Sequence, residues 1–287
     1  MRIIRADHLG MCFGVRDAIA MVKQQAAEQP ITVLGDLVHN EAVLSDLRRD
    51  GIRFENEISN VRTSAVMITA HGASDKRLDE VKKRGYGVFE ATCPLVHYAH
   101  RRLRELVDQG FHPIIVGKAG HVEVRGLTED LAEFDVVFSD HDVTQLQERS
   151  RFGVIAQTTQ PIERVRELVE LIQQRFPESE VRFIDTVCQP TKQRQTAAIE
   201  LAQQCDVVVV IGGAHSNNTK ELVNTCSRFC DQVYHVQATS DLHEEWFGDA
   251  DTIGITAGTS TPDELILEIE EQIETLAAVK TEMEVNV

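Results

Sequence analysis

The chain has 287 residues, of which 42% are hydrophobic and 26% charged, and its formal net charge at pH 7 is -17. This composition is typical of a globular protein with a buried core, and the length allows two or three small domains. The acidic balance argues against nucleic acid and anionic membranes as partners, because both are bound through basic patches.

The N-terminal residues lack the long apolar stretch of a signal peptide, and no run approaches the roughly 20 apolar residues that span a bilayer. We therefore expect a cytoplasmic protein with no membrane partner. In that compartment cysteines are expected to be thiols or metal ligands rather than disulfides. Cys205, Cys226 and Cys230 lie in helical patterns and are interpreted as packing residues, and the shared helix face of Cys226 and Cys230 makes them the first candidates for another role.

Short apolar runs alternate with amphipathic segments along the whole chain, which predicts parallel sheets covered by helices. In chain order, the predicted strands are 2–6, 32–35, a run from 65, 87–91, 113–117, a run from 153, 182–185, 207–211 and a run from 253. Predicted helices cover 15–29, a segment capped by Ser74 that ends at Gly85, and a segment from Pro161 to Phe176. A further helix is predicted after a capping box at 261–264, with Pro262 in its first position.

Three of the predicted strands precede a cysteine. Cys12 follows the strand at 2–6, Cys93 the strand at 87–91 and Cys188 the strand at 182–185. One cysteine therefore falls in each of three α/β repeats, which we place at 13–93, at 94–188 and at 189–280 together with 1–12. The N-terminal strand must then complete the third repeat, and 281–287 form a C-terminal tail.

Polar residues follow the other strands at a similar period. They form six short segments, at 39–40, 71–72, 120–123, 157–159, 212–218 and 256–260. In open α/β sheets ligands bind beyond the carboxyl ends of the strands, so three thiolates carried there can converge on one metal centre. The spacing of three isolated cysteines is by itself a weak signal for a shared cluster.

The motifs around these cysteines resemble those of the 4-hydroxy-3-methylbut-2-enyl diphosphate reductase family. They read Gly-Met-Cys-Phe-Gly-Val at 10–15, Ala-Thr-Cys-Pro-Leu-Val at 91–96 and Asp-Thr-Val-Cys-Gln-Pro-Thr-Lys-Gln-Arg-Gln at 185–195. Further matching segments are 38–40, 70–72, 119–124, 157–159, 216–219 and 256–263, so the resemblance covers about Ile3 to Glu270. The sequence departs from the family pattern at Gln189-Pro190 and at His215-Ser216-Asn217-Asn218, and the second departure leaves only the contact of Asn217 in doubt.

The resemblance implies an α/β fold of three similar small domains with parallel sheets, in a pseudo-threefold arrangement around a central iron-sulfur cluster. It implies an enzyme of the non-mevalonate pathway that reductively dehydroxylates an allylic diphosphate to isopentenyl and dimethylallyl diphosphate. Cys12, Cys93 and Cys188 would hold a 4Fe-4S cluster whose open iron binds the substrate oxygen. An electron donor such as ferredoxin or flavodoxin would be its partner.

The resemblance also implies a polar substrate site built from strand ends. Its expected substrate-binding residues are His39, His71, His121, Thr158, Ser216, Asn217, Asn218 and Ser260. Imidazole, hydroxyl and amide donors suit a diphosphate, and the helix predicted after Ser216 would add backbone N–H groups. Glu123 is the candidate catalytic acid, and Thr158 would relay its proton or orient the hydroxyl. A zinc hydrolase using the three histidines and a non-catalytic iron-sulfur sensor are the alternatives.

Overall fold

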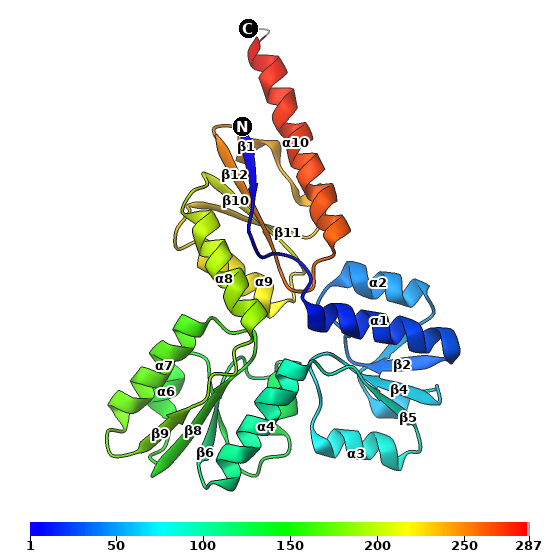
Figure 1. The fold of residues 1–287 in the computed structure, drawn as a ribbon, viewed down its shortest axis with the longest axis vertical. Helices are drawn as coiled ribbons and strands as arrows, with labels where there is room; N and C mark the ends of the chain where they lie inside the picture. The colour runs from blue at the N-terminus through cyan, green and yellow to red at the C-terminus, as the bar shows by residue number, and fades with distance from the viewer. Residues whose placement is uncertain (286–287) are drawn as a thin grey trace. The chain divides into compact units, whose positions relative to one another are not determined.

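The computed structural model describes residues 1–285, with side chains described through residue 276 (Figure 1). It contains three parallel four-stranded sheets, ordered β3-β2-β4-β5, β7-β6-β8-β9 and β11-β10-β12-β1. The first and third strands of each sheet are central, the second lies at one edge and the fourth at the other, with β1 as the fourth strand of the last sheet. The three sheets therefore share one topology. The predicted α/β class with three similar sheets is confirmed.

The first sheet consists of β2 (Ile31–Leu34), β3 (Arg53–Glu55), β4 (Ala65–Ile68) and β5 (Gly87–Glu90), with helices α1 (Phe13–Glu28), α2 (Glu41–Arg49) and α3 (Asp75–Lys83). The second consists of β6 (His112–Val116), β7 (Asp135–Val137), β8 (Arg151–Ala156) and β9 (Glu180–Phe183), with α4 (Pro94–Asp108), α5 (Val122–Thr128), α6 (Asp140–Gln145) and α7 (Ile162–Arg175).

The third sheet consists of β10 (Val207–Ile211), β11 (Gln232–Val236), β12 (Thr252–Ala257) and the N-terminal β1 (Arg2–Arg5). Its helices are α8 (Gln189–Ala202), α9 (Asn217–Cys226) and α10 (Asp263–Val285). The register pairs Arg2 with Thr252 and Arg5 with Ile255, so the N-terminal strand joins this sheet as the sequence predicts. Three short 3-10 helices lie at Ile58–Asn60, Thr239–Asp241 and Glu244–Phe247.

The chain divides into two compact units. The first contains residues 1–13, 39–43 and 189 onward, and the second contains 14–38 and 44–188. The boundaries of the three predicted repeats stay a prediction. Within the predicted tail, residues 281–285 continue α10, and 286–287 lie outside the described residues.

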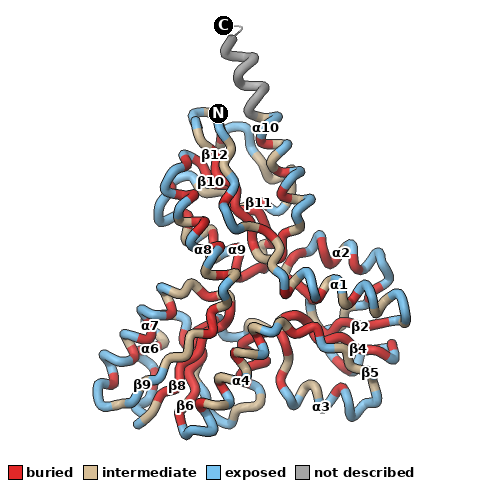
Figure 2. Tube along the Cα trace, viewed as in Figure 1, coloured by how far each residue is buried: buried red, intermediate tan, exposed pale blue. Residues whose placement is uncertain are grey.

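Buried apolar residues follow the central strands of every sheet (Figure 2). In the first unit, α8 and α9 pack on one face of the sheet against Val208 and Val210, and α10 packs on the other against Val207 and Val209. Because both faces are covered, the central strands are continuous apolar runs rather than alternating ones. Polar loops follow the carboxyl ends of these strands.

Most predicted helices are present, with shifts of one or two residues at their ends. Ser74 caps α3 by accepting a hydrogen bond from the backbone N–H of Arg77 at 3.1 Å. Pro161 precedes α7, and Pro262 precedes α10 by one residue, where a missing N–H costs nothing. The Thr261 hydroxyl donates to the carbonyl of Ile211 at 3.1 Å, which ties the start of α10 to β10.

Two placements differ from the sequence-based expectation. Strand β9 starts at Glu180 rather than at Arg182 and leaves 184–188 as an extended loop before Cys188. Cys205 and Cys230 lie in the turns that follow α8 and α9, whereas only Cys226 is helical. The helical pattern of apolar residues continues past the ends of these helices because all three cysteine side chains fill one apolar core. The structure therefore shows a packing role for them.

Candidate functional site

The three cysteine loops are held by the same backbone hydrogen bond. The N–H of Cys93 donates to the carbonyl of Ala70, that of Cys188 to Thr158 and that of Cys12 to Thr259, each at 3.0 Å. Each acceptor lies two residues beyond the end of the neighbouring strand, β4, β8 or β12. The three cysteines therefore occupy one topological position, at the carboxyl edge of each sheet.

The turn that presents each acceptor is also repeated. The N–H of Gly72 donates to Thr69, that of Gln160 to Gln157 and that of Thr261 to Gly258, at 3.0 to 3.1 Å. This turn places His71, Thr159 and Ser260 at equivalent positions directly after the residue that binds the cysteine. Two of the predicted substrate-binding side chains, those of His71 and Ser260, thus occupy one position of the repeat.

The second unit joins Glu123 to Thr158. The backbone N–H of Thr158 donates to Oε1 of Glu123 at 2.6 Å, and its hydroxyl donates to Oε2 at 2.9 Å. Glu123 is only 1% exposed, and burial raises its pKa to about 7, although the two hydrogen bonds from Thr158 lower it. A pKa in this range lets the carboxyl give or take a proton near neutral pH.

His71 and His121 lie beside each other in the same unit. Their ring centroids are 5.8 Å apart and the rings meet edge to face. His121 caps α5 because its Nδ1 accepts the N–H of Glu123 at 3.2 Å. A neutral ring that accepts at Nδ1 carries its proton on Nε2, so His121 donates from the opposite side of the ring.

In the first unit, the start of α9 gathers buried donors. The Ser216 hydroxyl accepts the N–H of Thr219 at 3.2 Å and caps the helix, which leaves the hydroxyl proton to donate elsewhere. Oδ1 of Asn218 accepts the N–H of Thr259 at 3.0 Å. Among the described residues, Nδ2 of Asn217 and Nδ2 of Asn218 are buried without a hydrogen-bond partner. Buried donors without a partner are costly, so each calls for an explanation.

His39 belongs to this unit too. The Ser260 hydroxyl donates to the carbonyl of His39 at 3.3 Å. A Cβ at Gly213 would collide with the same carbonyl, and a Cβ at Gly258 would collide with the Thr219 hydroxyl. Glycine is therefore required at Gly213 for the loop after β10 to approach His39, and at Gly258 for the loop after β12 to approach the start of α9. The first unit thus brings together the predicted residues His39, Ser216, Asn217, Asn218 and Ser260.

All six cysteines carry thiols in the structure. Cys12, Cys93 and Cys188 are partly exposed, and the three in the core are buried. Burial, followed by the neighbouring thiol of Cys230, raises the pKa of Cys205 to about 11 and that of Cys226 to about 12. Such thiols are poor metal ligands at neutral pH, which supports the packing interpretation.

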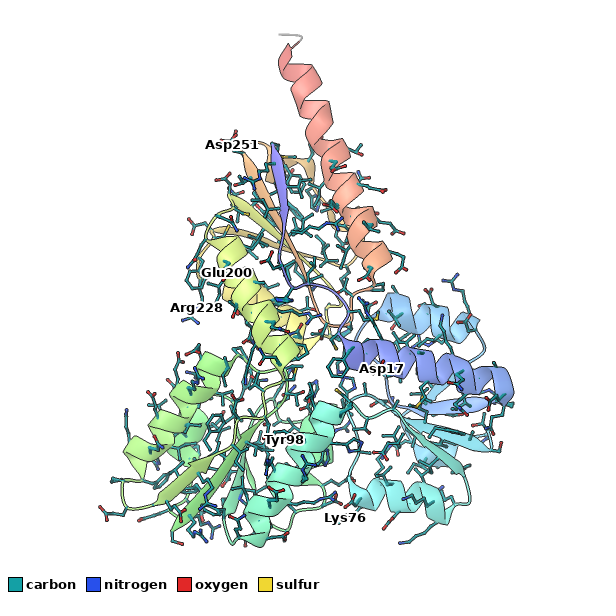
Figure 3. The ribbon with its side chains drawn as sticks, in the orientation of Figure 1. Asp17, Lys76, Tyr98, Glu200, Arg228 and Asp251 are labelled. Carbon is teal, nitrogen blue, oxygen red and sulfur yellow. The ribbon has the colours of Figure 1, made fainter. Side chains whose placement is uncertain are left out.

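Of the partly exposed cysteines, Cys93 lies against Gly14. A Cβ at Gly14 would lie 2.7 Å from Sγ of Cys93, so only glycine leaves room for that sulfur. Helices α1 and α4, marked in Figure 3 by Asp17 and Tyr98, begin directly after Cys12 and Cys93. Within the described residues, no group of three or more His, Cys, Asp or Glu side chains is arranged to hold a metal ion. Cys12 belongs to the first unit, and Cys93 and Cys188 belong to the second.

Several side chains that hold the loops were missed at the sequence level. Gln157 is fully buried, and its Oε1 accepts the N–H of Lys118 at 3.1 Å, which joins the loops after β8 and β6. His235 and Gln237 lie on or beside the edge strand β11 and bond to Gly212 and Ala214, at 2.7 and 2.8 Å. The only sequence signal was the presence of a polar side chain beside an apolar run.

Comparison with protein families identifies one match, to the model described as "LytB protein", which covers residues 3–274. The curated 4-hydroxy-3-methylbut-2-enyl diphosphate reductase of Trichlorobacter lovleyi is 36% identical over 271 residues, which cover 94% of this chain and 96% of that protein. The reductase of Geotalea uraniireducens is 34% identical over 96% of this chain and 97% of that protein.

Solved structures of the same enzyme are similar to this chain. The E-1-hydroxy-2-methyl-but-2-enyl-4-diphosphate reductase of Plasmodium falciparum aligns with a TM-score of 0.88 and 26% identity, over 94% of this chain and 87% of that one. A second structure, described as (E)-4-hydroxy-3-methyl-but-2-enyl diphosphate reductase, the terminal enzyme of the non-mevalonate pathway, aligns with a TM-score of 0.68 and 31% identity, over 96% of this chain and all of that one.

The raised pKa of Glu123 predicts a pH dependence of stability. The folded protein holds the proton up to a pKa of about 7 and the unfolded chain releases it near the ordinary value of 4.5. The free energy of unfolding of wild type, relative to that of Glu123→Gln, should therefore be greatest below pH 4.5. It should fall by on the order of 3 kcal/mol as pH rises to about 7 and stay level above that pH. Urea unfolding of both proteins across this range measures the difference. A difference that does not change with pH would show that the pKa is not raised.

Proposed function

This chain belongs to the LytB protein family, and from that premise we propose that it reductively dehydroxylates 4-hydroxy-3-methylbut-2-enyl diphosphate to isopentenyl and dimethylallyl diphosphate. As a member of the family it is an enzyme, a reductase of the non-mevalonate route to isoprenoids. The observation that carries the proposed chemistry is the repeated hydrogen bond that holds Cys12, Cys93 and Cys188 at equivalent strand edges.

The three cysteines are the proposed ligands of a 4Fe-4S cluster. They are thiols, they are partly exposed, and they are the only three of the six that follow an edge strand of the described sheets. Glycine at position 14 leaves room for the sulfur of Cys93 itself, because a Cβ there would lie 2.7 Å from it. When bound, such a cluster would supply electrons and one Lewis-acidic iron without a protein ligand.

The reaction requires two electrons and two protons. The carbon–oxygen bond breaks, the hydroxyl leaves as water after it receives one proton, and the allylic carbon receives the other proton together with the electrons. Glu123 is the proposed donor of the proton to the leaving oxygen, because burial raises the pKa of its carboxyl to about 7. Thr158, hydrogen-bonded to that carboxyl, would orient the substrate hydroxyl or pass the proton on.

The diphosphate is the proposed acceptor for the donors gathered in each unit. Asn217, Asn218 and Ser216 lie at the start of α9, where backbone N–H groups add to the attraction for an anion. His39 and Ser260 lie in the same unit, and His71 and His121 supply imidazole donors in the other. Hydrogen-bond donors of this kind offset the repulsion expected of a chain with a net charge of -17.

A small redox protein such as ferredoxin or flavodoxin is the proposed electron donor, since the family reaction consumes reducing equivalents. No helix of the described chain is long and apolar enough to cross a membrane. The cytoplasmic location and the lack of a nucleic-acid partner stay predictions from the sequence.

The cluster assignment predicts different outcomes for cysteines at the strand edges and in the core. Cys93→Ser should lose the cluster or retain it only weakly, because a serine hydroxyl is a poor ligand for iron in a cluster. Cys226→Ala is the control, since this buried thiol contacts only the core. Iron and sulfide analysis of anaerobically purified protein makes the comparison. A complete, active cluster in Cys93→Ser would rule out the assignment.

The anion site predicts that Asn218→Asp impairs diphosphate binding. The aspartate keeps the oxygen that accepts the N–H of Thr259, but it replaces a buried donor with an acceptor that repels the anion. Inorganic diphosphate should bind about ten- to hundred-fold more weakly, as measured by titration calorimetry. The matched control is Asn224→Asp, which adds the same charge at an exposed position of α9. Equal losses in both variants would place the anion elsewhere.

The role of Glu123 predicts a loss of turnover without a loss of binding. Glu123→Gln preserves the shape of the side chain but removes the transferable proton, so turnover should fall about a hundred-fold or more. The cluster content and the affinity for substrate should change little. Glu200→Gln, on the outer side of α8 (Figure 3), should behave like wild type. Near-normal turnover by the Gln variant would mean that the proton comes from another group.

A further inference from the structure

Arg194 occupies a position where the other repeats have alanine. It lies six residues after Cys188 in α8, and it is only 7% exposed. Six residues after Cys12 and Cys93, α1 and α4 carry the buried residues Ala18 and Ala99. Packing at this position therefore needs no more than a methyl group. A buried guanidinium is costly unless its N–H groups are bonded, so its presence requires a specific role.

The guanidinium bonds to two backbone segments. Nε and Nη2 of Arg194 donate to the carbonyl of Gly10, at 3.1 and 2.6 Å, and Nη1 donates to the carbonyl of Pro190 at 3.0 Å. Gly10 comes two residues before Cys12, and Pro190 comes two residues after Cys188. The planar fork of an arginine can reach both carbonyls at once, which the single ammonium of a lysine cannot do in the same geometry.

The Cys12 loop has a particular need for such a contact. At the equivalent position before Cys188, the Thr186 side chain accepts the N–H of Ala156 at 2.9 Å and donates to its carbonyl at 2.5 Å. Gly10 stands where Thr186 stands and has no side chain, and its φ of 74° lies in the left-handed region. The loop also follows β1, a four-residue edge strand whose one neighbour in the sheet is β12.

We propose that Arg194 is a positioning residue that clamps the Cys12 loop to the first turn of α8. Arg194, on a helix, holds the loop before Cys12, whereas in the second sheet Thr186 holds the loop before Cys188 from within that loop. The clamp fixes the carbonyl of Gly10 and thereby the thiol two residues later. It joins this loop to the segment that continues directly from Cys188. The inference rests on the assignment of the three cysteines as cluster ligands.

The first test uses the full chain without a cluster. Amide hydrogen exchange is compared in wild type, Arg194→Lys and Arg194→Met, with Arg228→Met as the control, because Arg228 is exposed in the same unit (Figure 3). Exchange at Gly10 and Cys12, whose N–H groups bond to Ala257 and Thr259, should accelerate about ten-fold in both Arg194 variants. Exchange in β10 should not change. Equal acceleration in β10 would mean a general stabilising role and would overturn the clamp.

The second test uses the protein reconstituted with iron and sulfide under anaerobic conditions. Iron release to a chelator should be about ten-fold faster in Arg194→Lys than in wild type and Arg228→Met. An unchanged release rate in a variant whose Gly10 amide exchanges faster would overturn the link between the clamp and cluster retention. A wild-type chain that binds no iron-sulfur cluster would refute the proposed function instead, and the exchange experiment would still decide whether the clamp exists.

Discussion

One backbone hydrogen bond, made three times, fixes the position of the three cysteines that we propose as cluster ligands. Each cysteine N–H donates to a carbonyl two residues beyond the end of the adjacent strand. The bond extends the pairing of the edge strand past the sheet, so the thiol is carried at the carboxyl edge, where parallel α/β sheets bind their ligands. Since the three sheets share one strand order, the same local geometry recurs in each of them.

The polar side chains of the candidate site form two groups, and each group lies in one unit. Glu123 is buried with both oxygens bonded to Thr158, so its environment adjusts a proton equilibrium. Asn217 and Asn218 are buried, and their amide donors have no partner among the described residues, which is why we propose that they bind the anion. The proposed proton supply and the proposed anion binding therefore involve different segments of the chain, and substitutions can separate them.

Much of the fold follows from patterns in the sequence. The central strands are apolar runs such as Val207–Ile211, and Ser74 and Pro161 correctly mark the starts of two helices. The three-residue strands β3 and β7 escape such analysis because they are short and only partly buried at sheet edges. Edge strands take their conformation from the partner strand more than from their own residues.

The sequence indicates candidate residues for the site, but it does not indicate which of them are hydrogen-bonded to one another. Glu123 and Thr158 are recognisable from their motifs, yet their hydrogen bonds join loops 35 residues apart and depend on the β6 and β8 register. The bond from Arg194 to Gly10 spans 184 residues and exists only because β1 joins the third sheet. Helical periodicity places Arg194 on the buried face but does not explain why a charge is there. Contacts of this kind are tertiary and have no local signature.

The most direct test of the account is Mössbauer spectroscopy of the wild-type chain reconstituted with 57Fe. Three cysteine ligands on a cube predict about four irons per chain, with one iron distinguishable from the other three because it lacks a thiolate. Addition of the allylic diphosphate should shift the signal of that one iron and leave the others nearly unchanged. A cluster with four equivalent thiolate-bound irons, or a chain that binds zinc without sulfide, would contradict the claim that the three strand-edge cysteines form the catalytic centre.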